Sequence, residues 1–357
     1  MLPKNPEFTW SPSRDAVFRE CPLKYYYNYY LFWNGWSWGS PAENRRAYLC
    51  KHIDSMSYVF GKAFREAMAI LFRSFKSDRY RNQPSEYLPK SIVNYVRTEM
   101  NKSYKCRNNI RGWFADPKHN PKLMESIYTG WMNDDFMRDS INAIREKIAE
   151  IPKYVQTKTY REFSEEVSLR WKMFHDAPGL FPDWKEEANA WIPEIDEDPF
   201  QTNAGKFYIG QYLIRTSVDL LYWKLDGSLV AVNWKTSDTR PKEDQLAMRV
   251  IALYLYHHYH VPFSKMCIRT EYVLSGKCEE FHPDEQTAAK TKLFILDQIE
   301  KMRSYVTDGD VSRNVALPED AFAEQVKAPN CFWCKYHGMC KRFANENVFE
   351  ELKKRAI

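Results

Sequence analysis

The chain has 357 residues, 44% hydrophobic and 28% charged, enough for one large domain or two small ones with a sizeable core. Its formal net charge of +5 is mildly basic, which permits an anionic partner without requiring one. No run of about 18 apolar residues occurs, which argues against a membrane-spanning helix, and the first residues lack the apolar core of a signal peptide. We therefore expect a cytoplasmic protein without a membrane partner, whose eight cysteines do not form a disulfide scaffold.

The N-terminal part is predicted to be helical and rich in aromatic residues. A helix starts at Ser11 or Ser13, either of which suits a helix cap, and continues into the tyrosine-rich run Cys21–Tyr30. A packed helix face and a stacking platform for unpaired bases are both compatible with these tyrosines. Apolar residues at helical spacing then predict a helix over Ser57–Met68, in which Phe64 is expected to lie in the core.

From Leu71 to Tyr160 the pattern is mostly helical, and its middle combines basic and aromatic residues. The residues that carry this character are Lys102, Tyr104, Lys105, Arg107, Arg111, Trp113, Phe114, Lys118 and Lys122. Such a segment fits a surface that follows a phosphate backbone, and it fits a solvated helical surface equally well. A strand is predicted next at Phe163–Trp171, where Glu165 and Glu166 point to opposite faces, so that only one of them faces a given site.

The stretch Ser217–Thr236 predicts a β-hairpin, because two apolar, β-rich runs flank an Asp-Gly pair. A three-residue loop, Leu225–Gly227 with its glycine left-handed, pairs Lys224 with Ser228. That register places the carboxylate of the first strand opposite the amide of the second, whereas a two-residue loop would put them on different faces. We therefore predict the odd-numbered loop.

The predicted register gathers three functional groups on one small patch. Asp219 lies opposite Asn233, and Lys235 shares the face of Asn233 because residues two apart on a strand project together. Beyond this hairpin, the pattern predicts an amphipathic helix that begins near Asp244, followed by two strands, Met266–Val273 and Lys277–Phe281, around a Ser-Gly turn.

The patch resembles the core of PD-(D/E)xK nucleases, in which an aspartate is followed, after a gap, by (Asp/Glu)-x-Lys-Thr. The resemblance implies that Asp219 and the second acidic position hold Mg²⁺ or Mn²⁺, and that Lys235 helps to orient the attacking water. Asn233 stands at the second acidic position. Its amide oxygen can ligate a metal ion but contributes no negative charge.

Further motifs resemble the RecB-type branch of these nucleases. The resemblance implies that Glu166, or else Glu165, is a third metal ligand, although an exposed glutamate fits the pattern as well. It also implies that Gln245, which matches the glutamine of Gln-x-x-x-Tyr, contacts substrate DNA near the catalytic centre. Two positions depart from the branch, because Phe64 replaces the histidine that follows Gly61 and Arg249 replaces the tyrosine. Phenylalanine cannot ligate a cation, so a second metal-binding position is lost.

Three cysteines near the C-terminus, Cys331, Cys334 and Cys340, have the spacing C-x2-C-x5-C. Thiolates at this spacing suit an iron–sulfur cluster or Zn²⁺. RecB-type nucleases with an iron–sulfur cluster, such as the CRISPR-adaptation nucleases, carry the fourth ligand upstream in a Cys-Pro setting. Cys21 matches that setting, so the resemblance implies a [4Fe–4S] cluster on these four cysteines, with Zn²⁺ as the alternative. The other cysteines, Cys50 among them, are expected to be buried thiols.

The resemblance implies an α/β fold with a restriction-endonuclease-like mixed central sheet flanked by helices. We divide the chain into an N-terminal helical part with the first cluster cysteine (1–70), a helical insertion (71–160), the nuclease-like core (161–300) and a cluster-binding segment (301–357). The four cysteines are expected to act as a clamp that joins the N- and C-terminal segments.

Two functional hypotheses follow. In the first, the chain is an iron–sulfur protein that binds DNA with impaired or lost cleavage and acts as a binding or scaffold subunit. In the alternative, it is an active Mg²⁺- or Mn²⁺-dependent DNA exo- or endonuclease with an altered metal site. In either case, a helicase or another nucleic-acid-processing or defence complex is the expected protein partner. A zinc-bearing protein–protein module unrelated to nucleic acid is a third interpretation.

Overall fold

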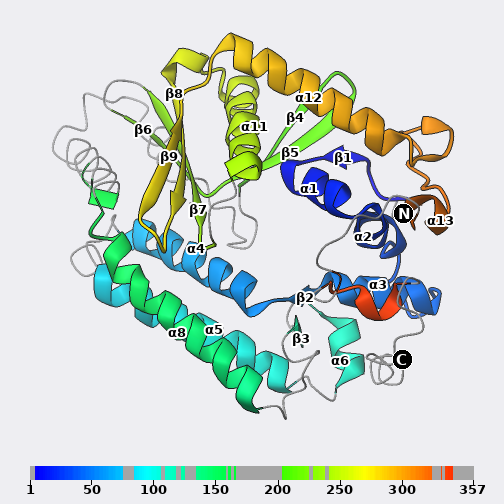
Figure 1. Cartoon of the computed structure of the whole chain (residues 1–357), viewed down its shortest axis with the longest axis horizontal. Helices are drawn as coiled ribbons and strands as arrows, with labels where there is room; N and C mark the ends of the chain where they lie inside the picture. Colours follow the sequence, from blue (N-terminus) through cyan, green and yellow to red (C-terminus); the bar gives the residue numbers. More distant parts are fainter. Residues whose placement is uncertain are drawn as a thin grey trace. The chain divides into compact units, whose positions relative to one another are not determined.

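The fold was established from a computed structural model of the whole chain (Figure 1). It describes residues 5–74, 84–105, 109–117, 122–124, 134–157, 160–161, 165, 203–224, 228–237, 241–323, 331 and 334–340. Within these ranges, no helix combines the length and the apolar character that crossing a bilayer requires.

The chain forms two compact units, and each is assembled from segments that are far apart in the sequence. The first unit comprises Met1–Met56, Arg97–Ser140 and Ile295–Ile357. The second comprises Ser57–Val96 and Ile141–Phe294. Both units therefore combine N-terminal segments with segments that follow much later in the chain.

The second unit contains a mixed four-stranded sheet in the order β6-β7-β8-β9. Strands β6 (Leu220–Trp223) and β7 (Leu229–Lys235) are antiparallel, β7 and β8 (Met266–Tyr272) are parallel, and β9 (Lys277–Phe281) is antiparallel to β8. The parallel pair needs a crossover connection, and helix α11 (Pro241–Tyr259) supplies it. Six of the seven residues of β7 are buried, which explains its almost continuous apolar sequence.

Helices cover the sheet, and two further strands pack against α11. Strands β4 (Asn203–Ile209) and β5 (Tyr212–Val218) form an antiparallel pair, turned at Gly210, which has a φ of 59°. Helix α11 packs on β4, β5 and β8, as Figure 1 shows. Gly205 lies under this helix, where an added Cβ would come within 2.8 Å of the Tyr254 ring.

The remaining helices of the second unit run in part beyond its borders. They are α4 (Met56–Ser74), α5 (Pro84–Lys105), α8 (Asp134–Tyr154) and α12 (Glu285–Arg303). Within the unit, α4 and α8 place Phe64 and Tyr154 next to Trp234 of β7, with ring centroids 6.0 Å apart for Phe64 and Trp234. This aromatic group forms the core on one face of the sheet.

The first unit is mostly helical. Its elements are β1 (Thr9–Trp10), α1 (Pro12–Glu20), α2 (Pro22–Tyr26), a π-helical turn (Tyr27–Leu31), α3 (Ala42–Lys51), β2 (Ile53–Asp54), α6 (Ile110–Ala115), β3 (Lys122–Leu123) and α13 (Glu319–Ala323). Ser11 caps α1 by accepting a hydrogen bond from the Arg14 amide, as the sequence predicts. Strands β2 and β3 form a short parallel pair.

Several predicted elements are confirmed, and others lie outside the described residues. The strands β8 and β9 and the helices α4 and α11 appear where hydrophobic periodicity predicts them. The mixed α/β architecture also agrees with the expected fold class. Of the predicted strand Phe163–Trp171, the structure describes Glu165, which is helical and exposed, so the strand prediction is wrong at this residue. Glu166 lies outside the described residues.

Candidate functional site

The central hairpin adopts the predicted register. Pairing runs from Leu220 with Val232 to Trp223 with Leu229, and the Lys224 amide donates to the Ser228 carbonyl over 2.8 Å. The strand pairing ends at Leu220. Asp219 forms a bend just before it, where its amide donates to the Val232 carbonyl over 3.1 Å and lies beside the Asn233 side chain. The loop residues 225–227 lie outside the described part of the chain, but the pairing on both sides fixes their number at three.

Asp219 is a nearly buried carboxylate between a backbone amide and a guanidinium. Its Oδ2 accepts a hydrogen bond of 2.9 Å from the Trp234 amide, and its Oδ1 lies 4.0 Å from Nε of Arg65. The side chain is 9% exposed. Burial raises the pKa of Asp219, and the charges of Arg65 and Lys235 and the Trp234 hydrogen bond partly oppose that effect. The two cations and the amide thus favour the ionised carboxylate where burial disfavours it.

The position of Arg65 follows from a close approach of helix to strand. Gly61 of α4 faces the end of β7, where an added Cβ would lie 3.0 Å from Oγ1 of Thr236. A larger residue at this position would require the Thr236 side chain to give way by a few tenths of an ångström. Arg65 follows Gly61 by four residues, one helical turn further along α4, and thereby reaches Asp219.

Asn233 is buried at 8% exposure beside Asp219, and its Oδ1 lies 3.4 Å from the Asp219 amide nitrogen. The amide oxygen thus faces a backbone donor. At this point of the hairpin the structure brings together one carboxylate and one neutral amide. A divalent cation here would receive half the charge that a pair of carboxylates provides.

Lys235 forms an ion pair with Asp244, a residue that the sequence reasoning did not assign to the site. Lys235 Nζ lies 3.1 Å from Asp244 Oδ1, and the Tyr272 hydroxyl donates to Asp244 Oδ2 over 2.8 Å. Asp244 is 4% exposed and stands in the first turn of α11, where a carboxylate suits the helix dipole. The one signal in the sequence was its position immediately before Gln245.

The remaining predicted site residues occupy different environments. Phe64 is fully buried, with ring centroids 5.9 Å from Tyr154 and 6.0 Å from Trp234, so its expected core role is confirmed. Gln245 is exposed on α11 next to the Lys235–Asp244 pair. Glu166 lies outside the described residues, so its predicted place in the patch stays a prediction.

The aromatic residues of the N-terminal part and of the basic segment are mainly core residues. Tyr25, Tyr27 and Tyr30 are buried, which favours the packed helix face over the stacking platform. Trp113 and Phe114 lie in a hydrophobic cluster with Leu49 and Ile53, and they are unavailable for base stacking. In the described part of that segment, Tyr104 is the aromatic residue with large exposure, at 47%.

The cysteine centre lies in the first unit. Cys21 is the N-cap of α2, and its Sγ accepts a hydrogen bond of 3.3 Å from the Lys24 amide. The C-terminal cysteines lie in a chain of tight turns: the Cys334 amide donates to Cys331 O, and the Cys340 amide donates to Tyr336 O. Backbone hydrogen bonds thus hold the C-x2-C-x5-C segment compact.

The thiols of this centre are close enough to influence one another. Burial raises the pKa of Cys21, and a charge on Cys331 raises it further. Burial raises the pKa of Cys334 to about 11, opposed by a hydrogen bond from the Tyr336 backbone, and charges on Cys21 and Cys340 again add to it. Electrostatic interactions thus link Cys21 with Cys331, and Cys334 with Cys21 and Cys340.

A fifth thiol, Cys50 of α3, lies near the same centre. Burial raises its pKa to about 12, the Lys335 charge opposes this, and a charge on Cys334 adds to it. Sequence spacing carried no signal for this neighbour, because α3 enters the centre through tertiary packing. Each of the seven cysteines that the structure describes is free of a disulfide bond.

A comparison with known protein families agrees with the nuclease resemblance of the hairpin. A sequence model of the PD-(D/E)XK nuclease superfamily matches residues 9–341, which is most of the chain. The protein therefore belongs to the PD-(D/E)XK nuclease superfamily. Searches among curated proteins and among solved structures found no similar chain.

Proposed function

We propose that this superfamily member is a RecB-type, iron–sulfur DNA-binding protein whose metal-dependent cleavage is impaired or lost. In this role it serves as a binding or scaffold subunit of a nucleic-acid-processing or defence assembly, with a helicase as one candidate partner. The observation that carries the proposal is the pairing of Asp219 with an amide, Asn233, and with a guanidinium, Arg65, instead of with a second carboxylate.

Arg65 supports the loss of cleavage because it supplies positive charge where a metal ion would act. Its Nε lies 4.0 Å from the carboxylate of Asp219, and its side chain is 32% exposed. Two unit charges at about 4 Å interact by about 4 kcal/mol at an effective dielectric constant of about 20. A divalent cation that approaches Asp219 is repelled by this guanidinium and attracted by a single carboxylate, so its binding is weak.

Phe64 and Lys235 support the same conclusion. Phe64 fills the position of the family histidine and is fixed in the core by Trp234, so this position provides no ligand. The ion pair between Lys235 and Asp244 gives the lysine a structural role. The presence of a lysine at this position is therefore explained without catalysis.

One face of α4 supports nucleic-acid binding better than the basic segment named from the sequence. Tyr58 is 50% exposed, and Lys62 Nζ lies 4.6 Å above its ring. Arg65 follows on the same helix face, since residues 58, 62 and 65 are spaced by four and three. An exposed aromatic ring beside two cations suits an unpaired base next to its phosphates.

The donor set of the cysteine centre fits an iron–sulfur cluster. The chain carries four cysteines in the sequence pattern of such sites, and amide groups of Lys24 and Tyr336 donate toward Cys21 and Cys334, as amides do at sulfur ligands of such clusters. The Cys-Pro setting of Cys21, which resembles that of the iron–sulfur RecB-type nucleases, favours a multi-iron cluster over a single zinc ion. A bound cluster would tie the N- and C-terminal segments of this unit together.

The decisive test is cleavage of labelled single- and double-stranded DNA with Mg²⁺ or Mn²⁺. We expect wild type to bind DNA without cutting it and Asn233→Asp to cut, because the new carboxylate restores the missing charge. Asn101→Asp, an exposed Asn-to-Asp change on α5, controls for added charge alone. The variant Lys235→Ala, combined with Asn233→Asp, should abolish the restored cleavage.

The alternative, an active nuclease with an altered site, is favoured by the charge of Lys235, which acts on Asp219 across the patch. In that case Asp219, the Asn233 oxygen and Glu166 share one Mg²⁺ or Mn²⁺ ion. Cleavage by wild type that Lys235→Ala abolishes would establish this alternative and refute the loss of activity.

A further inference from the structure

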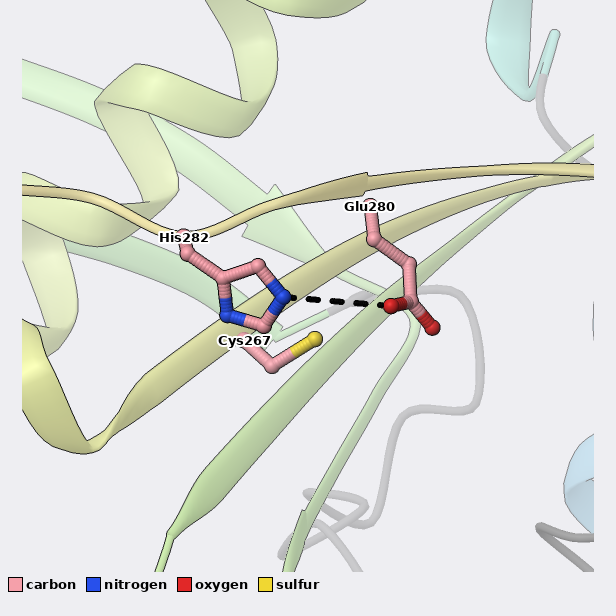
Figure 2. Close-up of side chains that lie close together, drawn as sticks. All are labelled: Cys267, Glu280 and His282. Carbon is pink, nitrogen blue, oxygen red and sulfur yellow. Dashed lines mark ion pairs between the residues drawn. The ribbon is translucent and has the colours of Figure 1, made fainter.

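Three potential metal ligands meet on strands β8 and β9, on the face of the sheet opposite to Asn233 and Lys235. Pairing of Ile268 with Phe281 places Cys267 next to His282 across the strands, and Glu280 is two residues from His282 on the same face. Figure 2 shows the three side chains converging, with the Cys267 thiol beside the gap between imidazole and carboxylate. One ligand atom from each side chain lies within 4.8 Å of the others.

The distances match the ligand shell of a single ion. His282 Nε2 lies 3.8 Å from Glu280 Oε2. Tetrahedral zinc, with bonds of about 2.0–2.2 Å to nitrogen and oxygen, separates two such ligands by roughly 3.4 Å. Small side-chain rotations close the difference. Sulfur, imidazole nitrogen and carboxylate oxygen are all ligands that zinc accepts.

Arg269 leaves one carboxylate oxygen of Glu280 available. Its Nε and Nη2 both lie 2.7 Å from Oε1, while Oε2 faces the imidazole. Arg269 is 6% exposed, so this contact is held inside the sheet face. A metal-ligating carboxylate is commonly fixed by such a second hydrogen bond, which orients its other oxygen toward the ion.

We propose that Cys267, Glu280 and His282 form a zinc-binding site, separate from the nuclease patch and from the cysteine centre. Cys267 is 8% exposed, whereas the Glu280 and His282 side chains are 42% and 68% exposed, so the ion enters from the solvent side. Three protein ligands leave a fourth position for water or for a side chain of a partner protein. Zinc at this position links β8 to β9, the last strand of the four-stranded sheet.

Two cations influence the thiol and the carboxylate of this site. Arg269 and Lys224 both act electrostatically on Cys267 and Glu280. When Zn²⁺ binds, the Cys267 thiol releases its proton, so that a thiolate and a carboxylate face the ion.

The test compares zinc stoichiometry in the full-length protein and in two matched histidine variants. His282→Gln removes one exposed ligand, and His258→Gln changes an exposed histidine at the end of α11. Equilibrium dialysis against Zn²⁺ after treatment with a chelator should give one ion fewer per chain for His282→Gln than for wild type or His258→Gln. Zinc bound by the cysteine centre is the same in all three proteins and cancels in the difference.

A second measurement identifies the sulfur ligand. Co²⁺ in place of Zn²⁺ should give a sulfur-to-metal charge-transfer band that is smaller in Cys267→Ser and in His282→Gln than in His258→Gln. Arg269→Lys, which weakens only the support of Glu280, should reduce zinc affinity by about 10- to 100-fold. Equal zinc stoichiometry and affinity in wild type and His282→Gln would refute the site, whether or not Cys267→Ser folds.

Discussion

The patch around Asp219 and the cysteine centre lie in different compact units, and they differ in how complete their donor sets are. The cysteine centre has all four thiols that its resemblance requires, and a fifth lies nearby. Among the described residues of the patch, Asp219 faces an amide and a guanidinium instead of a second carboxylate, and a buried phenylalanine fills the position of the family histidine. The proposed function therefore predicts that this chain retains the ligands of a stabilising cluster and lacks ligands of a catalytic metal ion.

The largest effect is expected for substitutions in the cysteine centre, where all four proposed ligands are present. Cys331→Ser and Cys21→Ser should give insoluble or colourless protein, because metal ligation in small sites contributes about 10 kcal/mol or more to folding. Visible absorption and iron content per chain are the measurements. Cys50→Ser is the matched control, and it should remain soluble and brown. Soluble Cys331→Ser protein with an undiminished visible band would contradict the ligand assignment.

The next largest effect is expected at the patch around Asp219, where a second carboxylate is missing. Asn233→Asp, alone or with Arg65→Gln, should bind Mn²⁺ at least about tenfold more tightly than wild type. The new carboxylate adds a Coulomb attraction and the loss of Arg65 removes a repulsion, each of more than about 1.4 kcal/mol. Mn²⁺ binding followed by electron paramagnetic resonance measures this without requiring cleavage. If the double variant binds Mn²⁺ no better than wild type, the patch lacks a metal site for reasons beyond these two residues.

The contrast between the two regions also shows what the sequence could reveal. The hairpin register followed from residues within twenty positions of one another, since loop length alone decides which side chains share a face. Phe64 could be assigned to the core from helical periodicity. These inferences depend on local geometry, which the order of residues encodes directly.

Contacts between distant elements could not be predicted in the same way. Arg65 reaches Asp219 only because α4 approaches β7 at Gly61, and Asp244 reaches Lys235 only because α11 packs on the sheet. The basic segment was considered as a nucleic-acid-binding surface because Trp113 lies among basic residues in the sequence. In the structure, Trp113 points into a hydrophobic cluster. Side-chain direction in a short helix depends on tertiary packing that composition does not show.

A smaller effect is expected for DNA binding by α4. Tyr58→Ala should weaken binding of single-stranded DNA by about 1–3 kcal/mol if a base stacks on its ring. Lys62→Ala should weaken binding of all sequences alike and reduce the slope of log K against log salt concentration by about one. Fluorescence anisotropy at several salt concentrations measures both. Tyr104→Ala, which changes an exposed aromatic residue of the other unit, is the control, and an equal loss in that variant would argue against a specific role of α4.

The smallest effect concerns a buried carboxylate behind the patch. Glu271 of β8 lies across from Trp234 in the sheet and accepts a hydrogen bond from the Tyr154 hydroxyl. Burial raises the pKa of Glu271, so the folded protein holds this proton to a higher pH than the unfolded chain does. The stability that results is complete below the ordinary pKa of glutamate and is lost as the pH rises through the raised value.

Glu271→Gln should remove this loss, because glutamine does not titrate and its oxygen still accepts from Tyr154. The unfolding temperature of wild type should therefore fall, relative to that of the variant, between acidic and neutral pH. Glu285→Gln, at an exposed position on α12, should keep the wild-type pH dependence. Parallel curves for wild type and Glu271→Gln would mean that the Glu271 carboxyl group is charged throughout this pH range. That charge would add negative potential behind β7 and weaken the conclusion that the patch has too little negative charge to bind a metal ion.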